Sequence, residues 1–224
     1  MGPLPHEVRK ESVTQAYREM VAAFKFLQRI RDCFLGISAT AIQRSGLTAL
    51  TLMALLLNRN TFNDPSNPES GLAGFAFAIT IAGVGITIGA IIAPFGVAKF
   101  GRHKWIRFSL FASATLPIFL ALEQNELLLV STGFFAGMAG QGVKVTNDAL
   151  VQSKIADEYR GRVFAVYDVM VNFGIVSGAV IAAFILPASG VSSLLPALIA
   201  TTYILFAALA LKKSNFNSDF SPTN

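Results

Sequence analysis

The feature that most constrains this chain is a series of apolar runs, each of about 20 residues, the length that a helix needs to cross the hydrocarbon core of a bilayer. Short polar or charged segments separate the runs. The expected fold class is therefore all-α, a polytopic transmembrane helical bundle. Its six spans are expected at about 34–57, 71–99, 105–122, 127–151, 163–186 and 191–211.

The composition excludes an ordinary soluble domain and gives no sign of an enzyme. Charged residues make up 14% of the 224 residues, against roughly 25% in soluble domains. The single cysteine, Cys33, cannot form an internal disulfide, and His6 and His103 are too far apart in sequence for a zinc motif. No phosphate-binding loop, HExxH or GxSxG pattern occurs. We expect no cofactor, no metal and no enzymatic activity.

Residues 1–32 predict a cytosolic lead that contains an amphipathic helix. Ser12 and Gln15 have capping-box spacing. The apolar residues that follow at helical spacing are Val13, Tyr17, Met20, Phe24 and Leu27. The basic residues elsewhere on the helical wheel are Arg18, Lys25 and Arg29. Such a helix either lies along the membrane surface or packs on the protein's own cytosolic face, and both readings stay open.

The two ends of the chain carry no further span. Residues 1–32 lack the apolar core of a cleavable signal peptide, so none is expected. Residues 33–211 form the expected transmembrane domain. Residues 212–224 are polar and are expected to form a disordered cytosolic tail.

Lysine and arginine are distributed unequally between the two sides of the predicted bundle. Of the 18 such residues, 15 lie in the lead, in the loops after the second and fourth spans and in the tail. Arg59 alone lies in the opposite loops. The positive-inside rule then places both termini in the cytoplasm of a plasma (inner) membrane protein. The net charge of +5 is therefore no indication of nucleic-acid binding.

Polar groups inside the spans are the candidates for function, because each needs a partner or a role at that depth. The substrate or coupling candidates are Arg44, Lys144, Asp148, Asp168 and Asn172. Arg44 is expected either to contact an anionic substrate group or coupling carboxylate, or to form a structural ion pair with Asp148 or Asp168. Asn147, Asn172 and Gln141 are expected to line a polar cavity or to bond a neighbouring helix.

The two carboxylates also leave alternatives open. Lys144 and Asp148 are one helical turn apart and form either an intrahelical ion pair or part of a proton relay. Asp168 either carries a coupling proton or bonds to loop amides, Arg160 or Arg162.

Loops and glycines add conformational predictions. Arg160-Gly161-Arg162 predicts a sharp turn and a latch on the cytoplasmic face. The candidate gating residues of the two basic loops are Gly101, Arg102, Lys104, Asp157, Arg160, Gly161 and Arg162. Small-residue faces that admit a close helix are predicted at Gly85/Gly89, Gly133/Gly137 and Gly174/Gly178.

The arrangement of six spans, a basic Gly101-Arg102-x-Lys104 turn and the Arg160-Gly161-Arg162 turn resembles half of a major facilitator superfamily transporter. The segments 42–60 and 149–168 resemble the C-terminal half in the actinobacterial drug- and siderophore-exporter-like branch. The acidic residue usual in the family's basic loop would fall at Ala98 and is absent, which suits a C-terminal half. The resemblance makes residues 1–32 the connector between two halves.

The resemblance implies a secondary transporter that moves a small organic solute by alternating access, with proton-coupled efflux. The expected partners are the lipid bilayer, a small-molecule substrate and either a missing N-terminal half or a second copy in a homodimer. Two alternatives remain: a truncated or split half that is inactive alone, and a membrane interaction or assembly protein that transports nothing.

Overall fold

The computed structural model describes residues 13–211, with side chains from residue 18 onward except at Pro68. The cap predicted at Ser12 and the tail predicted at 212–224 lie outside the described residues. The helices are α1 (Val13–Arg29), α2 (Arg31–Leu57), α3 (Pro68–Phe100), α4 (Arg102–Leu122), α5 (Glu126–Lys154), α6 (Asp157–Ile185) and α7 (Leu194–Leu205). Two short π-helical segments, η1 (Asn58–Phe62) and η2 (Phe206–Ala210), extend α2 and α7. The described chain contains no strand.

Four helical stretches are long and apolar enough to cross a membrane. They are Arg31–Phe62, Glu69–Phe100, Arg102–Leu122 and Asp157–Ile185. Helix α5 has 29 residues, but polar side chains such as Gln141 and Lys144 make it less apolar than these four. The stretch Leu194–Ala210 is apolar but shorter. The all-α membrane class is supported, and the count of six spans stays a prediction.

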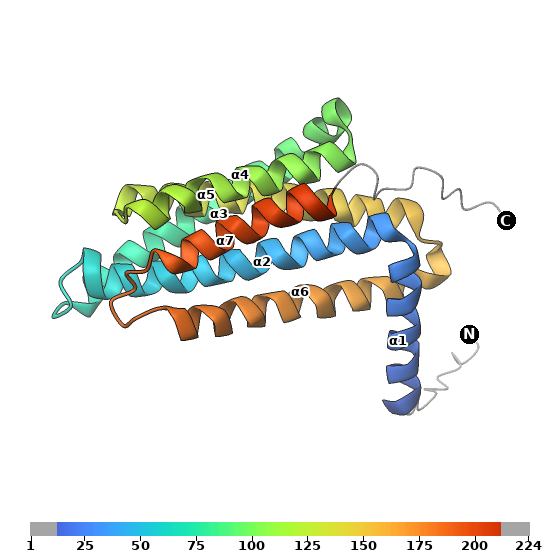
Figure 1. The fold of residues 1–224 in the computed structure, drawn as a ribbon, viewed down its shortest axis with the longest axis horizontal. Helices are drawn as coiled ribbons and strands as arrows, with labels where there is room; N and C mark the ends of the chain where they lie inside the picture. Colours follow the sequence, from blue (N-terminus) through green and yellow to red (C-terminus); the bar gives the residue numbers. More distant parts are fainter. Residues whose placement is uncertain (1–12, 212–224) are drawn as a thin grey trace, which may run out of the picture.

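Helices α2 to α7 run along a common long axis, and α1 crosses that axis at one end (Figure 1). Helix α2 contacts α5, α6 and α7, whereas α5 contacts α2, α3 and α4. The two helices therefore lie at the centre of the bundle, and their shared surface positions most of the polar side chains described below.

Close approach between the helices depends on glycines that face backbone. A Cβ atom at Gly85 or Gly89 of α3 would collide with a carbonyl of α5, and one at Gly174 or Gly178 of α6 would collide with a carbonyl of α2. Gly137 of α5 faces the backbone of α3 in the same way. The faces predicted at Gly85/Gly89 and Gly174/Gly178 are confirmed as packing surfaces, whereas in the Gly133/Gly137 face a Cβ atom at Gly133 would make only an ordinary contact. The carbonyls belong to Phe134, Met138, Ala41, Ser45 and Ala82.

The turns follow local chemistry, with one correction. Gly101 joins α3 to α4 with a φ of 80°, a conformation that glycine adopts without steric cost. The sharp turn predicted at Gly161 is wrong, because α6 already begins at Asp157 and Gly161 lies within it. Asp157 and Glu158 occupy the first turn of α6, where negative charge is favourable at a helix N-terminus. The chain turns instead at Ile155 and Ala156.

The polar segment after α2 is only partly a loop. Residues 58–62 continue the helix as η1, so the turn itself covers residues 63–67. The backbone amide and hydroxyl of Ser66 both donate to Asp64 Oδ1, at 2.9 and 2.7 Å. These two hydrogen bonds lower the pKa of the Asp64 carboxyl below its usual value. Asn67 then caps α3, since its side chain accepts a hydrogen bond from the Ser70 amide at 3.4 Å.

Helix α1 packs on the protein. Ala23 and Leu27 are buried in an apolar cluster with residues of α2, α5 and α6. The ring of Phe26 stacks on Tyr159 of α6 with the centroids 5.5 Å apart. Met20, which the helical spacing placed among the apolar residues, is 40% exposed. Of the two readings of this helix, the structure describes the one in which the helix packs on the bundle itself.

Candidate functional site

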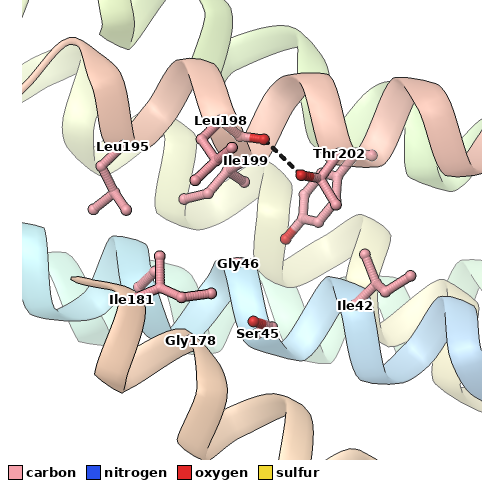
Figure 2. A pocket seen from close by; sticks show the side chains of 11 residues that line it. Ile42, Ser45, Gly46, Gly178, Ile181, Leu195, Leu198, Ile199 and Thr202 are labelled. Atoms are coloured by element: carbon pink, nitrogen blue, oxygen red, sulfur yellow. Dashed lines mark hydrogen bonds between the residues drawn. The ribbon is translucent and has the colours of Figure 1, made fainter. Parts of the chain in front are cut away.

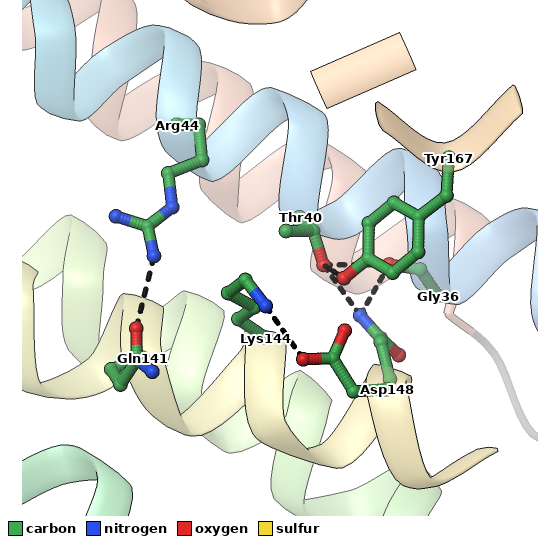
Figure 3. A network of polar contacts seen from close by, with 8 residues as sticks. Gly36, Thr40, Arg44, Gln141, Lys144, Asp148 and Tyr167 are labelled. Atoms are coloured by element: carbon green, nitrogen blue, oxygen red, sulfur yellow. Dashed lines mark hydrogen bonds and ion pairs between the residues drawn. The ribbon is translucent and has the colours of Figure 1, made fainter. Parts of the chain in front are cut away.

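Polar side chains from α2, α5 and α6 meet in one network (Figure 3). Arg44 Nη2 of α2 donates a hydrogen bond to Gln141 Oε1 of α5 at 3.0 Å. Lys144 Nζ and Asp148 Oδ2 form an ion pair at 2.6 Å one turn further along α5. Gln141, Lys144 and Asp148 lie three and four residues apart and thus share one side of α5. We call these four residues the α2–α5 polar face.

Arg44 lacks the ion pair predicted for it. It lies 13 residues into α2, a helix of 27 residues, and its side chain is half-buried. Among the described residues, no carboxylate oxygen lies within 4.0 Å of its guanidinium, so the expected ion pair with Asp148 or Asp168 is not formed. Asp148 pairs with Lys144 instead, and Arg44 donates to the neutral Gln141, about two turns away from Asp148 along α5. The α2–α5 polar face consequently carries one uncompensated positive charge.

A buried pair of side-chain amides holds α2 and α5 together behind this face. Asn147 Nδ2 donates to the Gly36 carbonyl at 2.5 Å and to Thr40 Oγ1 at 2.7 Å. Gln43 Nε2 donates in the opposite direction, to the Ala136 carbonyl at 2.9 Å. Both amide side chains are fully buried. Asn147 therefore bonds the neighbouring helix, which was one of its two predicted roles.

Each amide enters a notch made by a glycine of the other helix. A Cβ atom at Gly36 would collide with the Asn147 side chain, and one at Gly140 would collide with that of Gln43. Gly36 and Gln43 are seven residues apart on α2, as are Gly140 and Asn147 on α5. Interhelical hydrogen bonds of this kind fix the relative position of two helices in a membrane. The Arg44–Gln141 contact is thus built on a well-defined helix pair.

Tyr167 connects α6 to the network, and no motif in the sequence marks this residue. Its hydroxyl donates to Thr40 Oγ1 at 3.4 Å, beside the Asn147 contact. Its ring belongs to the apolar cluster that also contains Leu27 of α1. Tyr203 of α7 similarly donates to the Gln43 carbonyl, at 2.8 Å. An aromatic residue in an apolar helix is usually a packing residue, so only the fold reveals these hydroxyl contacts.

Asp168 and Asn172 lie outside this network. Both are exposed on α6, and Asn172 Nδ2 donates to the Asp168 backbone carbonyl at 2.8 Å. Within residues 13–211, Asp168 forms no ion pair, so the expected bond to Arg160 or Arg162 is absent. Asn172 instead bonds its own helix. The structure separates these two candidates from Arg44, Lys144 and Asp148.

The candidate gating residues gather at the end of the bundle near α1. Arg160 pairs with Asp157 at 2.6 Å and donates to the Gln152 carbonyl near the end of α5. Arg162 instead reaches Glu19 of α1 at 3.5 Å. The remaining members of this group are exposed: Gly101, Arg102, Lys104, Asp157 and Gly161. Arg102 Nη1 donates to Ser153 Oγ at 2.9 Å, and this joins α4 to α5.

The ion pair between Lys154 and Asp32, also at this end, was not predicted from the sequence. Lys154 Nζ of α5 lies 2.7 Å from Asp32 Oδ2 of α2. The Asp32 side chain is 9% exposed and that of Lys154 is 21% exposed. Asp32 lies in the first turn of α2 and Lys154 in the last turn of α5. Each charge is therefore also stabilised by the dipole of its own helix.

Two apolar cavities of the described bundle lie away from the α2–α5 polar face. Figure 2 shows a pocket of about 120 Å³ between α2, α6 and α7. A more open groove of about 440 Å³ continues from it between α2 and α6, sharing Ile42 and Ser45. Neither contains a charged side chain. Within residues 13–211, no three His, Cys, Asp or Glu side chains gather as metal ligands.

Comparison with known proteins identifies the family. Residues 33–223 match the sequence profile of the Major Facilitator Superfamily. The chain is 28% identical over 155 residues to the uncharacterized MFS-type transporters Mb0038c of Mycobacterium bovis and Rv0037c of Mycobacterium tuberculosis. The match covers 69% of this chain and 34% of each relative, so the chain spans about a third of their length. The chain thus belongs to the Major Facilitator Superfamily, a family of membrane transporters and not of enzymes.

Proposed function

We propose that the chain is the C-terminal, six-span half of a secondary transporter that moves a small organic solute by alternating access, in proton-coupled efflux. The observation that carries this proposal is the α2–α5 polar face. It brings Arg44, Gln141, Lys144 and Asp148, all half-buried, together on one side of α2 and α5. A charged group at this depth must face water, solute or protein, because exposure to lipid is strongly unfavourable.

The charge of the face indicates what it contacts. Lys144 and Asp148 neutralise each other, and Arg44 adds one positive charge that a neutral amide holds in place. The guanidinium has five N–H donors in a planar fork, of which the described contact with Gln141 uses one side. This arrangement suits a solute with an anionic group, which would complete the contacts of Arg44.

Proton coupling is assigned to Asp148, the carboxylate of the α2–α5 polar face. Asp148 is 28% exposed and Lys144 is 41% exposed, so the ion pair can be reached from the open side. An anionic solute on Arg44 competes with Asp148 for the positive charges of the face.

The proposed topology has both termini in the cytoplasm of the plasma (inner) membrane. It is supported by the basic residues at the end of the bundle where α1 lies, with Arg59 at the opposite end. Residues 1–32 would be the connector between halves, and 33–211 the membrane domain. We further propose that the chain belongs to the drug- and siderophore-exporter-like branch of the family, on the resemblance of segments 42–60 and 149–168.

The open side of the α2–α5 polar face requires a cover. In the family's transporters two six-helix halves enclose the solute near the middle of the membrane. We therefore propose that a second six-helix unit lies over this face. This unit is either an N-terminal half or a second copy of this chain. If no transport is found, the chain is an inactive half or an assembly protein that transports nothing.

Replacing Arg44 with alanine tests this function. We expect Arg44→Ala to reduce efflux of an anionic amphiphilic dye by tenfold or more, on the order of the loss of one charge-assisted contact. The measurement is dye efflux from energised cells that express the chain, with the amount in the membrane determined by immunoblot. Arg59→Ala, in η1 beyond the end of α2, is the matched control and should transport normally.

Two outcomes would count against the proposal. Unchanged efflux in Arg44→Ala at equal membrane insertion would remove Arg44 from the solute pathway. Absence of efflux in the unmodified chain, even with a second six-helix half co-expressed, would favour the assembly protein.

A further inference from the structure

Helix α1 carries a basic stripe that the transport proposal does not use. Arg18, Lys25 and Arg29 follow one another at intervals of seven and four residues, which places them on one side of the helix. All three are exposed, and among the described residues none has a carboxylate within 4.0 Å. Three exposed cations on one side of a 17-residue helix form a surface for a negatively charged partner.

The opposite side of α1 is committed to the protein. Ala23 and Leu27 lie five and nine residues after Arg18, about half a turn round the helix, and both are buried in the apolar cluster. Glu19 pairs with Arg162 and Phe26 stacks on Tyr159, so α6 holds one flank of α1. The helix therefore cannot turn its apolar residues into a membrane, and the basic stripe is the side that faces outward.

The position of α1 sets the depth of the stripe. Figure 1 shows α1 running across the long axis of the bundle and extending past α6. It contacts α6 at Tyr159, Arg162 and Val163, within the first turns of a helix that begins at Asp157. Helix α6 has 29 residues, so it is about 43 Å long, whereas the hydrocarbon core is about 30 Å thick. Its first turns, and α1 beside them, lie at the level of the lipid headgroups.

We propose that the stripe formed by Arg18, Lys25 and Arg29 binds the headgroups of anionic phospholipids in the adjacent leaflet. The charges are complementary, and the helix lies in the plane of the membrane at headgroup depth. Each lysine or arginine near an anionic surface adds to the attraction, and salt screens it. The partner is the lipid surface rather than an acidic protein, because a helix at this depth meets headgroups along its whole exposed side.

Lipid binding at this stripe would fix α1 against the end of the bundle. Helix α1 shares its apolar cluster with Tyr167, whose hydroxyl reaches Thr40 in the network behind the α2–α5 polar face. The surface is nevertheless independent of the transport proposal, since none of its three basic residues belongs to that network.

Hydrogen exchange in lipid nanodiscs tests the proposal with the full 224-residue chain. The amides of residues 18–29 should exchange about tenfold or more slowly in nanodiscs of phosphatidylcholine with phosphatidylglycerol than in phosphatidylcholine alone. High salt should remove the difference. The triple variant Arg18→Gln/Lys25→Gln/Arg29→Gln should lose it, while Arg18→Lys/Arg29→Lys should keep it.

The matched control is Lys99→Gln/Arg102→Gln/Lys104→Gln, which removes the same charge from the same end of the bundle but not from α1. It should retain the slow exchange of α1. Equal exchange in the two lipids, or a lipid effect that survives in the α1 triple variant, would overturn the proposal. So would protection of α1 in cell membranes without any in the anionic nanodiscs, since that result would assign the stripe to a protein partner. Unchanged exchange in α2 and α5 verifies that each variant is folded.

Discussion

Gly85→Val is expected to lower the melting temperature by many degrees and to leave little folded protein. A Cβ atom at this position would collide with the Phe134 carbonyl of α5. Because the obstacle is backbone, it cannot rotate away as a flexible side chain would. Inserting carbon into a well-packed contact costs about 1–3 kcal/mol and more where nothing can yield. The measurement is thermal unfolding in detergent, followed by size-exclusion chromatography of the remaining folded fraction.

Gly83→Val is the matched control for this experiment. Gly83 lies two residues away on the same helix, and a Cβ atom there would meet nothing within 4 Å. Both variants make the same change in helix propensity, so the difference between them isolates the α3–α5 contact. Equal melting temperatures would show that α3 and α5 are not packed through Gly85.

Lys154→Met is expected to destabilise the bundle by about 3 kcal/mol, the usual effect of removing one partner of a buried ion pair. Asp32 would remain 9% exposed without its cation. Its second oxygen, Oδ1, is already buried without a hydrogen-bond partner among the described residues. Chemical denaturation of the purified protein in mixed micelles measures the free energy of unfolding.

The double variant Asp32→Asn/Lys154→Met separates the ion pair from the loss of a side chain. It should recover a large part of the stability, because no charge is then left buried without a partner. Strictly additive losses would mean that Asp32 and Lys154 do not interact. Arg160→Met serves as the comparison, since its partner Asp157 is 87% exposed and the pair contributes little.

The helices could be predicted because the bilayer imposes a length and an apolar composition that are visible in the sequence. The glycine faces could also be predicted, since spacing of four residues places Gly85 with Gly89 and Gly174 with Gly178 on one side of a helix. The prediction of a turn at Gly161 was wrong, because glycine permits a turn but does not require one. Helix α6 instead begins four residues earlier, with the acidic residues Asp157 and Glu158 in its first turn.

The partners of the polar side chains could not be predicted, because they depend on which helices become neighbours. Asp32 and Lys154 are 122 residues apart in sequence, and Asn147 contacts a carbonyl 111 residues away. To predict that Arg44 contacts Gln141 while Asp148 pairs with Lys144, one would need to know how α2 and α5 are rotated about their axes. The sequence does contain one pattern from which a contact could have been predicted. Gly36 and Gln43 have the same seven-residue spacing as Gly140 and Asn147, and each amide side chain packs against the glycine of the other helix.

The central claim, that the α2–α5 polar face borders a water-filled solute pathway, is tested most directly by the accessibility of a cysteine at Thr48. Thr48 lies one turn after Arg44, and its hydroxyl donates to the Arg44 carbonyl at 2.9 Å. Thr115 of α4 makes the equivalent bond to Phe111 at 3.1 Å, but it lies on an exposed, otherwise apolar side with Phe108 and Phe119. The native Cys33 is fully buried and provides a low background.

We predict that Thr48→Cys in native membranes reacts with a hydrophilic, membrane-impermeant thiol reagent, whereas Thr115→Cys does not. Reaction at Thr48→Cys should also slow when Arg44 is replaced by a bulkier aromatic residue that fills the pathway. If Thr48→Cys and Thr115→Cys are equally inert in folded protein, the face meets no water, and the transport pathway assigned to it would be wrong.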